Sequence, residues 1–365
     1  DAMFNSNNHA AAENVFIGIQ SGGGNWAAGA NYNVGIGSYT LMGAMNSGQF
    51  NTAVGQSSLR NLTQGDDNVG IGYLAGTNIT TGSDNVCIGT NAGGTISTED
   101  NNTYIGYESA RYVDDGTNNV AVGYASMKGY AGAGNDATDN VAVGVNSMTA
   151  IVDGDQNTAV GKNSLKSLTD GHFNVAIGSG ALDELVTGSN NIAIGKDALH
   201  SADGGEGQHI AIGTNALALL DGSSYATVGI GQDALKTLTT APLTVGVGYK
   251  AGEDITTAES FTGVGYGVGM KISTGNNNTG LGAECLAYAS ANPLTSYGNT
   301  AVGRYAGRVL EGVAQENTII GGNAGANITT GKYNTAVGAL SGTTLSTGQY
   351  NVLLGYKAGE AQTGS

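Results

Sequence analysis

Hydrophobic and polar positions alternate in a five-residue phrase that returns along the whole chain. The phrase reads Asn-x-x-(Val/Ile/Leu)-Gly and occurs twenty times with few departures. In the copy that ends at Gly178, Val175 and Ile177 point to one face and Ala176 points to the other, which is the period-2 pattern of a β-strand. The closing glycine can turn the chain without steric cost. Each copy therefore predicts one short strand followed by a corner.

The spacing of these phrases is nearly constant. Their closing glycines are 17 residues apart in twelve of the nineteen intervals, 18 apart in four, 19 apart in one and 21 apart in two. A fixed period of this length predicts stacked, nearly identical units. A second apolar position follows seven residues after most of the glycines, before a polar corner. The predicted fold class is all-β: a parallel β-solenoid of about twenty rungs, each a two-strand β-roll, roughly 90–100 Å long at ~4.8 Å per rung.

The repeat also divides the chain into segments. We expect an N-terminal connecting segment at residues 1–13, a solenoid shaft at residues 14–355 and a C-terminal end segment at residues 356–365. The two intervals of 21 residues predict longer loops near residues 126–139 and 284–298. Because insertions in solenoids form loops on one face and often bind partners, Tyr130, Tyr288 and Tyr297 are candidate receptor contacts.

Tyrosine also recurs outside the long loops. Six copies place a tyrosine directly after the turn glycine, and Tyr73, Tyr107 and Tyr124 are further candidate receptor contacts, since an exposed aromatic row can stack on sugar rings. The alternative is structural: such rings can cover neighbouring strand surface while the hydroxyl stays in water.

Asparagine begins sixteen of the twenty phrases, with His209, Thr227, Thr244 and Phe261 as the exceptions. In stacked parallel strands, asparagine side chains in register bond to their equivalents above and below. We therefore expect a structural ladder of amides that includes Asn68, Asn85, Asn157, Asn174, Asn191 and Asn334.

Charge and chemistry narrow the function. The net charge of −16, from 13 basic and 29 acidic residues, disfavours a nucleic-acid partner. The sequence contains no stretch of 18 apolar residues, so it predicts no membrane span. No pattern typical of catalysis occurs, so we expect no enzymatic activity and no cofactor.

Acidic corners such as Asp66 and Asp67 suit solvated turns and at most weak Ca²⁺ binding. Cys87 and Cys285 occupy positions of small residues and are expected to be buried, and His209 to replace a ladder amide rather than hold a metal.

The central strand residue, as at Ala176, is Ala or Gly in most copies. This small face predicts a close neighbour, and a 17-residue coil encloses so thin an interior that we expect a second chain to supply it. The chain is therefore expected to associate with itself. A hexapeptide-repeat acyltransferase fits poorly, because only one hexad fits each coil, and an ice-binding rod would need a regular Thr-x-Thr face.

The repeats at Asn157–Leu165 and Asn334–Gly338 resemble the 17-residue Asn-x-Ala-Val-Gly repeats of phage tail-fibre proteins, and in pattern the head repeats of trimeric autotransporter adhesins. The resemblance covers Asn14 to Gly355. It implies a left-handed homotrimer located in a virion tail, acting as a fibre shaft or receptor-binding segment. Its partners would be other tail proteins and a host-surface glycan or protein. The alternative is a bacterial trimeric adhesin at the cell surface.

Overall fold

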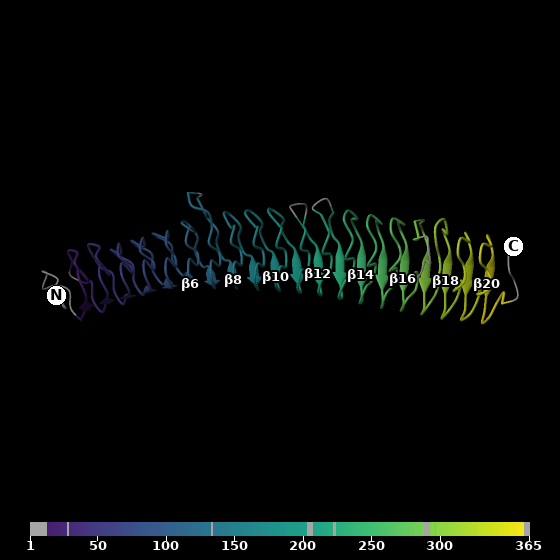
Figure 1. The fold of residues 1–365 in the computed structure, drawn as a ribbon, viewed down its shortest axis with the longest axis horizontal. Helices are drawn as coiled ribbons and strands as arrows, with labels where there is room; N and C mark the ends of the chain where they lie inside the picture. The colour runs from purple at the N-terminus through teal and green to yellow at the C-terminus, as the bar shows by residue number, and fades with distance from the viewer. Residues whose placement is uncertain are drawn as a thin grey trace. The chain divides into compact units, whose positions relative to one another are not determined.

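The computed structural model describes residues 13–27, 29–132, 134–202, 207–221, 224–287, 293–295 and 297–360. The chain divides into two compact units, which meet in the sequence between Thr187 and Gly188. The described residues form strands, turns and bends, with no helix among them. Within each unit the strands stack in chain order, so the predicted parallel β-solenoid is confirmed (Figure 1).

Each described rung contains one strand of three residues. In the first unit these are β1 (Val15–Ile17), β2 (Val34–Ile36), β3 (Thr52–Val54), β4 (Val69–Ile71), β5 (Val86–Ile88), β6 (Thr103–Ile105), β7 (Val120–Val122), β8 (Val141–Val143), β9 (Thr158–Val160) and β10 (Val175–Ile177). In the second unit they are β11 (Ile192–Ile194), β12 (Ile210–Ile212), β13 (Val228–Ile230), β14 (Val245–Val247), β15 (Thr262–Val264), β16 (Thr279–Leu281), β17 (Thr300–Val302), β18 (Thr318–Ile320), β19 (Thr335–Val337) and β20 (Val352–Leu354).

Neighbouring strands of one unit pair in parallel, with equivalent positions side by side. Val69 of β4 lies opposite Val86 of β5, for example, and Ile71 lies opposite Ile88. The segment with the second apolar position forms turns, which backbone bonds also link from rung to rung: the amide of Leu165 donates to Ala181 O at 3.0 Å. Each described rung therefore has one three-residue strand and one turn segment, and a few rungs of the second unit add an isolated parallel bridge outside the strands, as between Ile272 and Leu294.

The small residue at the centre of each strand points into the chain's own interior, so the expectation that it faces a second chain is wrong. Ala176 has no exposed surface, whereas Val175 and Ile177 are partly exposed. The reason is that a leucine of the preceding rung packs over the strand: a Cβ added to Gly70 would lie 2.8 Å from Cγ of Leu59. One coil therefore buries this face unaided, and the Val/Ile face is the one directed outward.

Neighbouring rungs match each other in volume. The central strand residue meets the fourth residue after the turn glycine, and where one is large the other is small. Tyr104 is fully buried at a centre where most copies have Ala or Gly, and the facing Gly93 has no room for a side chain: its Cβ would lie 3.0 Å from Cδ2 of Tyr104. Ile319 is accommodated in the same way by Gly307 and Gly325.

Three positions of each rung have a left-handed backbone. They are the residue before the phrase and the second and fourth residues after the turn glycine, such as Gln156 (φ 55°), Asn163 (φ 58°) and Leu165 (φ 47°). Glycine adopts this conformation freely, while Leu165 offsets its strain by burying its whole side chain in the core. In nineteen of the twenty rungs the fourth position is either glycine or a buried Leu or Met, with Ala110 as the exception.

A ladder of buried asparagines links the rungs at the corner before each strand. The Asn157 side chain accepts a bond from the Asn174 amide at 2.9 Å, and its Nδ2 donates to Asn140 Oδ1 at 3.1 Å and to Gly171 O at 2.8 Å. The same bonds to the preceding asparagine recur at Asn68, Asn85 and Asn334. Asn174 Nδ2 donates to Asn157 Oδ1 at 3.1 Å, and Asn191 Oδ1 accepts from the amide of His209 at 3.1 Å.

The ladder changes its chemistry in the second unit, between Asn191 and Asn278. There Thr227 donates its hydroxyl to Ala241 O at 3.3 Å, and Thr244 donates to Ala258 O at 3.2 Å. Phe261 is fully buried at the next equivalent position. These rungs keep the stacked strands but lack the amide bonds between successive side chains that the asparagine rungs have.

The turn glycines stack so closely that a side chain cannot fit between them. We expect Gly161→Ala to lower the unfolding temperature, because its Cβ would lie 2.5 Å from Gly178 O and because alanine would be held at φ 136°. The backbone strain alone should cost about 1–3 kcal/mol, and the clash adds to it. Thermal unfolding followed by circular dichroism measures the effect.

Two controls separate strain from contact. Gly355→Ala imposes the same strain, at φ 121°, with no atom within 4 Å of the new Cβ, and Gly322→Ala has neither a positive φ nor a neighbour. We expect destabilisation to decrease from Gly161→Ala to Gly355→Ala to Gly322→Ala. Equal unfolding temperatures for the first two variants would contradict close glycine stacking.

Candidate functional site

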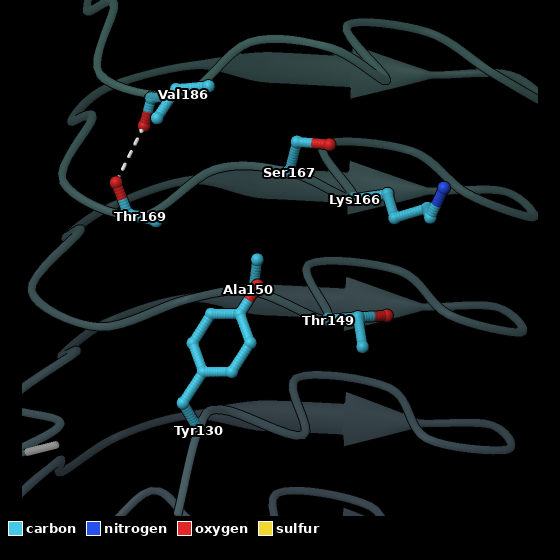
Figure 2. Close-up of a pocket in the computed structure, with 7 residues that line it drawn as sticks. All are labelled: Tyr130, Thr149, Ala150, Lys166, Ser167, Thr169 and Val186. Atoms are coloured by element: carbon cyan, nitrogen blue, oxygen red, sulfur yellow. Dashed lines mark hydrogen bonds between the residues drawn. The ribbon is translucent and has the colours of Figure 1, made fainter.

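The first long rung forms one wall of a surface groove in the first unit. Tyr130, from the predicted loop at residues 126–139, lies beside the turn segments of the following rungs, and Thr149, Ala150, Lys166, Ser167, Thr169 and Val186 complete the lining. The groove has a volume of about 380 Å³. Figure 2 shows the Tyr130 ring next to Ala150, with the Lys166 ammonium pointing away from the ring.

This groove combines an aromatic ring with polar side chains. Thr169 donates its hydroxyl to Val186 O at 3.1 Å, which fixes one edge (Figure 2). Lys166 Nζ lies 3.8 Å from Asp183 Oδ1, so its charge is partly balanced. An apolar ring beside hydroxyl groups and one ammonium is suited to a flat ligand that carries hydroxyls.

A second groove lies in the second unit, just after the second long rung. It has a volume of about 490 Å³ and is lined by Tyr305, Arg308, Val309, Asn323, Ala326 and Asn327. The guanidinium carbons of Arg304 and Arg308 lie 4.3 and 4.5 Å from the centre of the Tyr305 ring. Arg308 also pairs with Glu284, from the beginning of the predicted loop at 284–298, at 3.1 Å. Neither arginine is predicted as a site residue by the repeat pattern.

The tyrosines that follow the turn glycines lie outside both grooves. Tyr107 and Tyr124 stack on each other with ring centroids 5.4 Å apart and an angle of 7° between the rings. Tyr107 is 47% exposed and Tyr124 is 54% exposed, so each ring covers part of the other and leaves the rest of its surface in solvent. Tyr73 is exposed at the equivalent position. These rings are thus accessible, while mutual stacking also gives them a structural role.

Of the two candidate tyrosines near the second long loop, the structure describes one. Tyr288 lies outside the described residues. Tyr297 is exposed, and its carbonyl accepts a bond from the Glu316 amide at 3.1 Å, but it does not line either groove. Of the candidate tyrosines that the structure describes, Tyr130 is the one that it places in a groove.

The acidic corners offer little to a cation. Burial raises the pKa of Asp115 above its ordinary value, and the nearby carboxylates of Asp114 and Asp136 raise it further. Among the described residues, no three carboxylate, histidine or cysteine side chains are grouped so that they could hold a metal ion. Weak Ca²⁺ binding therefore stays a prediction from the sequence, without a site in the described part of the chain.

Buried nucleophiles are held in their protonated forms. Cys87 and Cys285 are buried and not in disulfides, and burial raises the pKa of each thiol to about 12. A thiol with so high a pKa is a poor nucleophile and metal ligand at neutral pH. Both cysteines therefore act as small core residues, as their positions in the repeat predict.

His209 takes the place of a ladder asparagine inside the second unit. It is 3% exposed, and its backbone amide donates to Asn191 Oδ1 at 3.1 Å. Burial lowers the pKa of His209 to about 4, although a hydrogen bond to the Ser224 backbone opposes this effect. The ring faces the interior of its own coil, which does not favour a metal shared between copies of the chain.

No protein-family model matches this chain, and no curated protein is significantly similar to it. The part of the chain that the structure describes contains no helix that could span a bilayer. The basis for a functional proposal is therefore the solenoid itself, its outward faces and its two grooves.

The buried histidine predicts acid sensitivity. The pKa of His209 is lower in the folded state than the ordinary value of 6.5, so the unfolded chain binds more protons as the pH falls from 6.5 to about 4. Stability should therefore be lost over this range, by about 3 kcal/mol if the full difference is expressed. Denaturant unfolding at several pH values measures this loss.

The matched variant is His209→Asn, which removes the titrating ring and restores the residue found in most rungs. We expect its stability to change less between pH 6.5 and 4 than that of the unaltered chain. His200→Asn, at an intermediate-exposure position, controls for removal of a histidine elsewhere. Parallel pH profiles for the two variants would contradict the role of His209.

Proposed function

We propose that this chain is a structural fibre protein: a left-handed, homotrimeric β-solenoid that acts as the shaft or receptor-binding segment of a virion tail. The observation that carries the proposal is the outward face of the strands. Every strand directs two residues outward, and all of them are Val, Ile, Leu or Thr, from Val15 and Ile17 of β1 to Val352 and Leu354 of β20. None is charged, and many are substantially exposed.

A face of this kind favours burial against another chain. All-parallel sheets normally have both faces covered, and a contiguous apolar surface on a soluble protein marks an interaction site. A second copy fits this role because its own outward residues repeat at the same rung spacing, so aliphatic rows meet rung by rung. The small inward residues, by contrast, are already buried within one coil.

The remaining surface suits contact with a receptor. The grooves at Tyr130 and Tyr305 use residues of the turn segments, which are separate from the outward strand face. Both adjoin the long rungs, where extra chain length alters the regular surface. A fibre that associates through its strands would therefore leave these grooves open to a host-surface glycan or protein. The resemblance of the repeats to those of phage tail fibres supports the same function.

Charge on the outward strand face should dissociate the assembly. We expect the double variant Ile71→Lys/Ile88→Lys to be a folded monomer, because two ammonium groups on neighbouring rungs would have to be buried in the trimer interface. Native mass spectrometry of the unaltered chain should give three copies. Asn61→Lys adds one positive charge at an exposed turn position and should leave the trimer intact. A monomeric unaltered chain would contradict the proposal.

Receptor contact at the first groove is tested by Tyr130→Ala on an array of defined glycans. Loss of the ring should weaken binding roughly threefold to tenfold, as expected for one aromatic contact. Tyr225→Ala, which removes an exposed tyrosine outside both grooves, should bind like the unaltered chain. Equal binding by all three proteins would exclude Tyr130 as a receptor contact.

A further inference from the structure

The second groove concentrates positive charge in an acidic protein. The chain contains four arginines and has a net charge of −16, yet two of the arginines, Arg304 and Arg308, flank one tyrosine. Since their guanidinium carbons lie 4.3 and 4.5 Å from the same ring centre, they are at most 8.8 Å apart, the sum of these distances. Glu284 pairs with Arg308 at 3.1 Å, so the two guanidinium groups and one carboxylate leave a net charge of +1.

Tyr305 holds the two cations in place. Arg304 donates a hydrogen bond to Tyr305 Oη at 2.7 Å, and the guanidinium groups of Arg304 and Arg308 both contact the Tyr305 ring. Contacts between cations and an aromatic face orient a guanidinium without using most of its N–H donors. Arg304 is exposed and does not itself line the groove, but it contacts Tyr305, which does. The two guanidinium groups are thus positioned before any ligand arrives.

The opposite wall of the groove is neutral and polar. Asn323 and Asn327 come from the next rung, and Asn327 Nδ2 donates to Thr343 O at 2.7 Å, which fixes its amide plane. Val309 and Ala326 supply apolar surface between the walls. Guanidinium forks match the geometry of carboxylate and sulfate groups, and amides exchange hydrogen bonds with hydroxyls.

We propose that this groove binds an anionic saccharide, with its carboxylate or sulfate group on Arg304 and Arg308 and its hydroxyls on Asn323 and Asn327. The inference rests on the proposed receptor-binding function and specifies the chemical class of the receptor. Two cations beside one ring repel each other in the free protein, and a bound anion would relieve that repulsion. A neutral sugar carries no charge that could offset this repulsion, so it would gain no charge-assisted hydrogen bond from either arginine.

The test is isothermal titration calorimetry of the full chain with three oligosaccharides of equal length: a sulfated heparin hexasaccharide, a hexamer of galacturonic acid and neutral maltohexaose. The two acidic ligands should bind, and maltohexaose should not. Arg304→Gln/Arg308→Gln should weaken binding of the acidic ligands about tenfold or more, as expected for lost charge-assisted hydrogen bonds. Arg60→Gln, at another arginine that lies over a tyrosine, should bind like the unaltered chain.

Further variants keep the outcome interpretable. Arg304→Lys/Arg308→Lys preserves the positive charges but not the planar guanidinium forks, so it should lose part of the affinity for the acidic oligosaccharides. Full affinity in this variant would show that the guanidinium geometry does not contribute to binding. Thermal unfolding shows whether each variant is folded. Equal affinities for the Gln double variant and the unaltered chain, or binding of inorganic sulfate without either acidic oligosaccharide, would overturn the proposal.

The results separate this inference from the broader function. Glycan-array binding that depends on Tyr130 but not on the arginines would leave receptor binding intact and remove the anionic groove. Arginine-dependent binding of the acidic ligands by a monomeric chain would support the groove and remove the trimeric fibre.

Discussion

The stacking distance between rungs is the constraint on which the rest of this structure depends. At each corner one glycine lies against the next so closely that a Cβ on Gly161 would reach within 2.5 Å of Gly178 O. The same approach brings Asn157 and Asn174 within hydrogen-bond distance on the other side of the strand. Because every rung repeats this geometry, any side chain at a given position faces its equivalents at a fixed spacing, and rows of aliphatic, amide and aromatic groups result.

The sequence predicts the features that are local and periodic. The alternation around Ala176 predicts its strand, and the recurring asparagine predicts an amide ladder, because both depend only on residues at a constant spacing. The direction of the strand faces was predicted wrongly. The length of a 17-residue coil predicts an interior too thin to bury the small face, but Leu59 and its equivalents reach across from the preceding rung and fill the interior over Gly70.

The sequence predicts less of the two grooves, because each is lined by residues from more than one rung. The length of its rung predicts Tyr130 as a contact residue, but the residues that line the groove with it, such as Ala150 and Thr169, belong to rungs further along the chain and become neighbours only by stacking. The repeat pattern does not predict Arg304 and Arg308 as site residues, because arginine does not recur at either position: Arg304 follows a turn glycine where six other copies have tyrosine. A signal did exist: in a chain with four arginines, two occur within five residues on either side of Tyr305.

The matched volumes of neighbouring rungs have a consequence for how such a chain can change its length. An exchange in whole repeats would preserve both the glycine corners and the amides. It would not preserve the interior. Joining the rung of Tyr104 directly after the rung of Leu59 would put a leucine where Gly93 now leaves space for the phenol ring. A new junction therefore fits where the central strand residue is small, or where a bulky one such as Tyr104 follows a rung with glycine at the fourth position, so the order of the copies is itself inherited information.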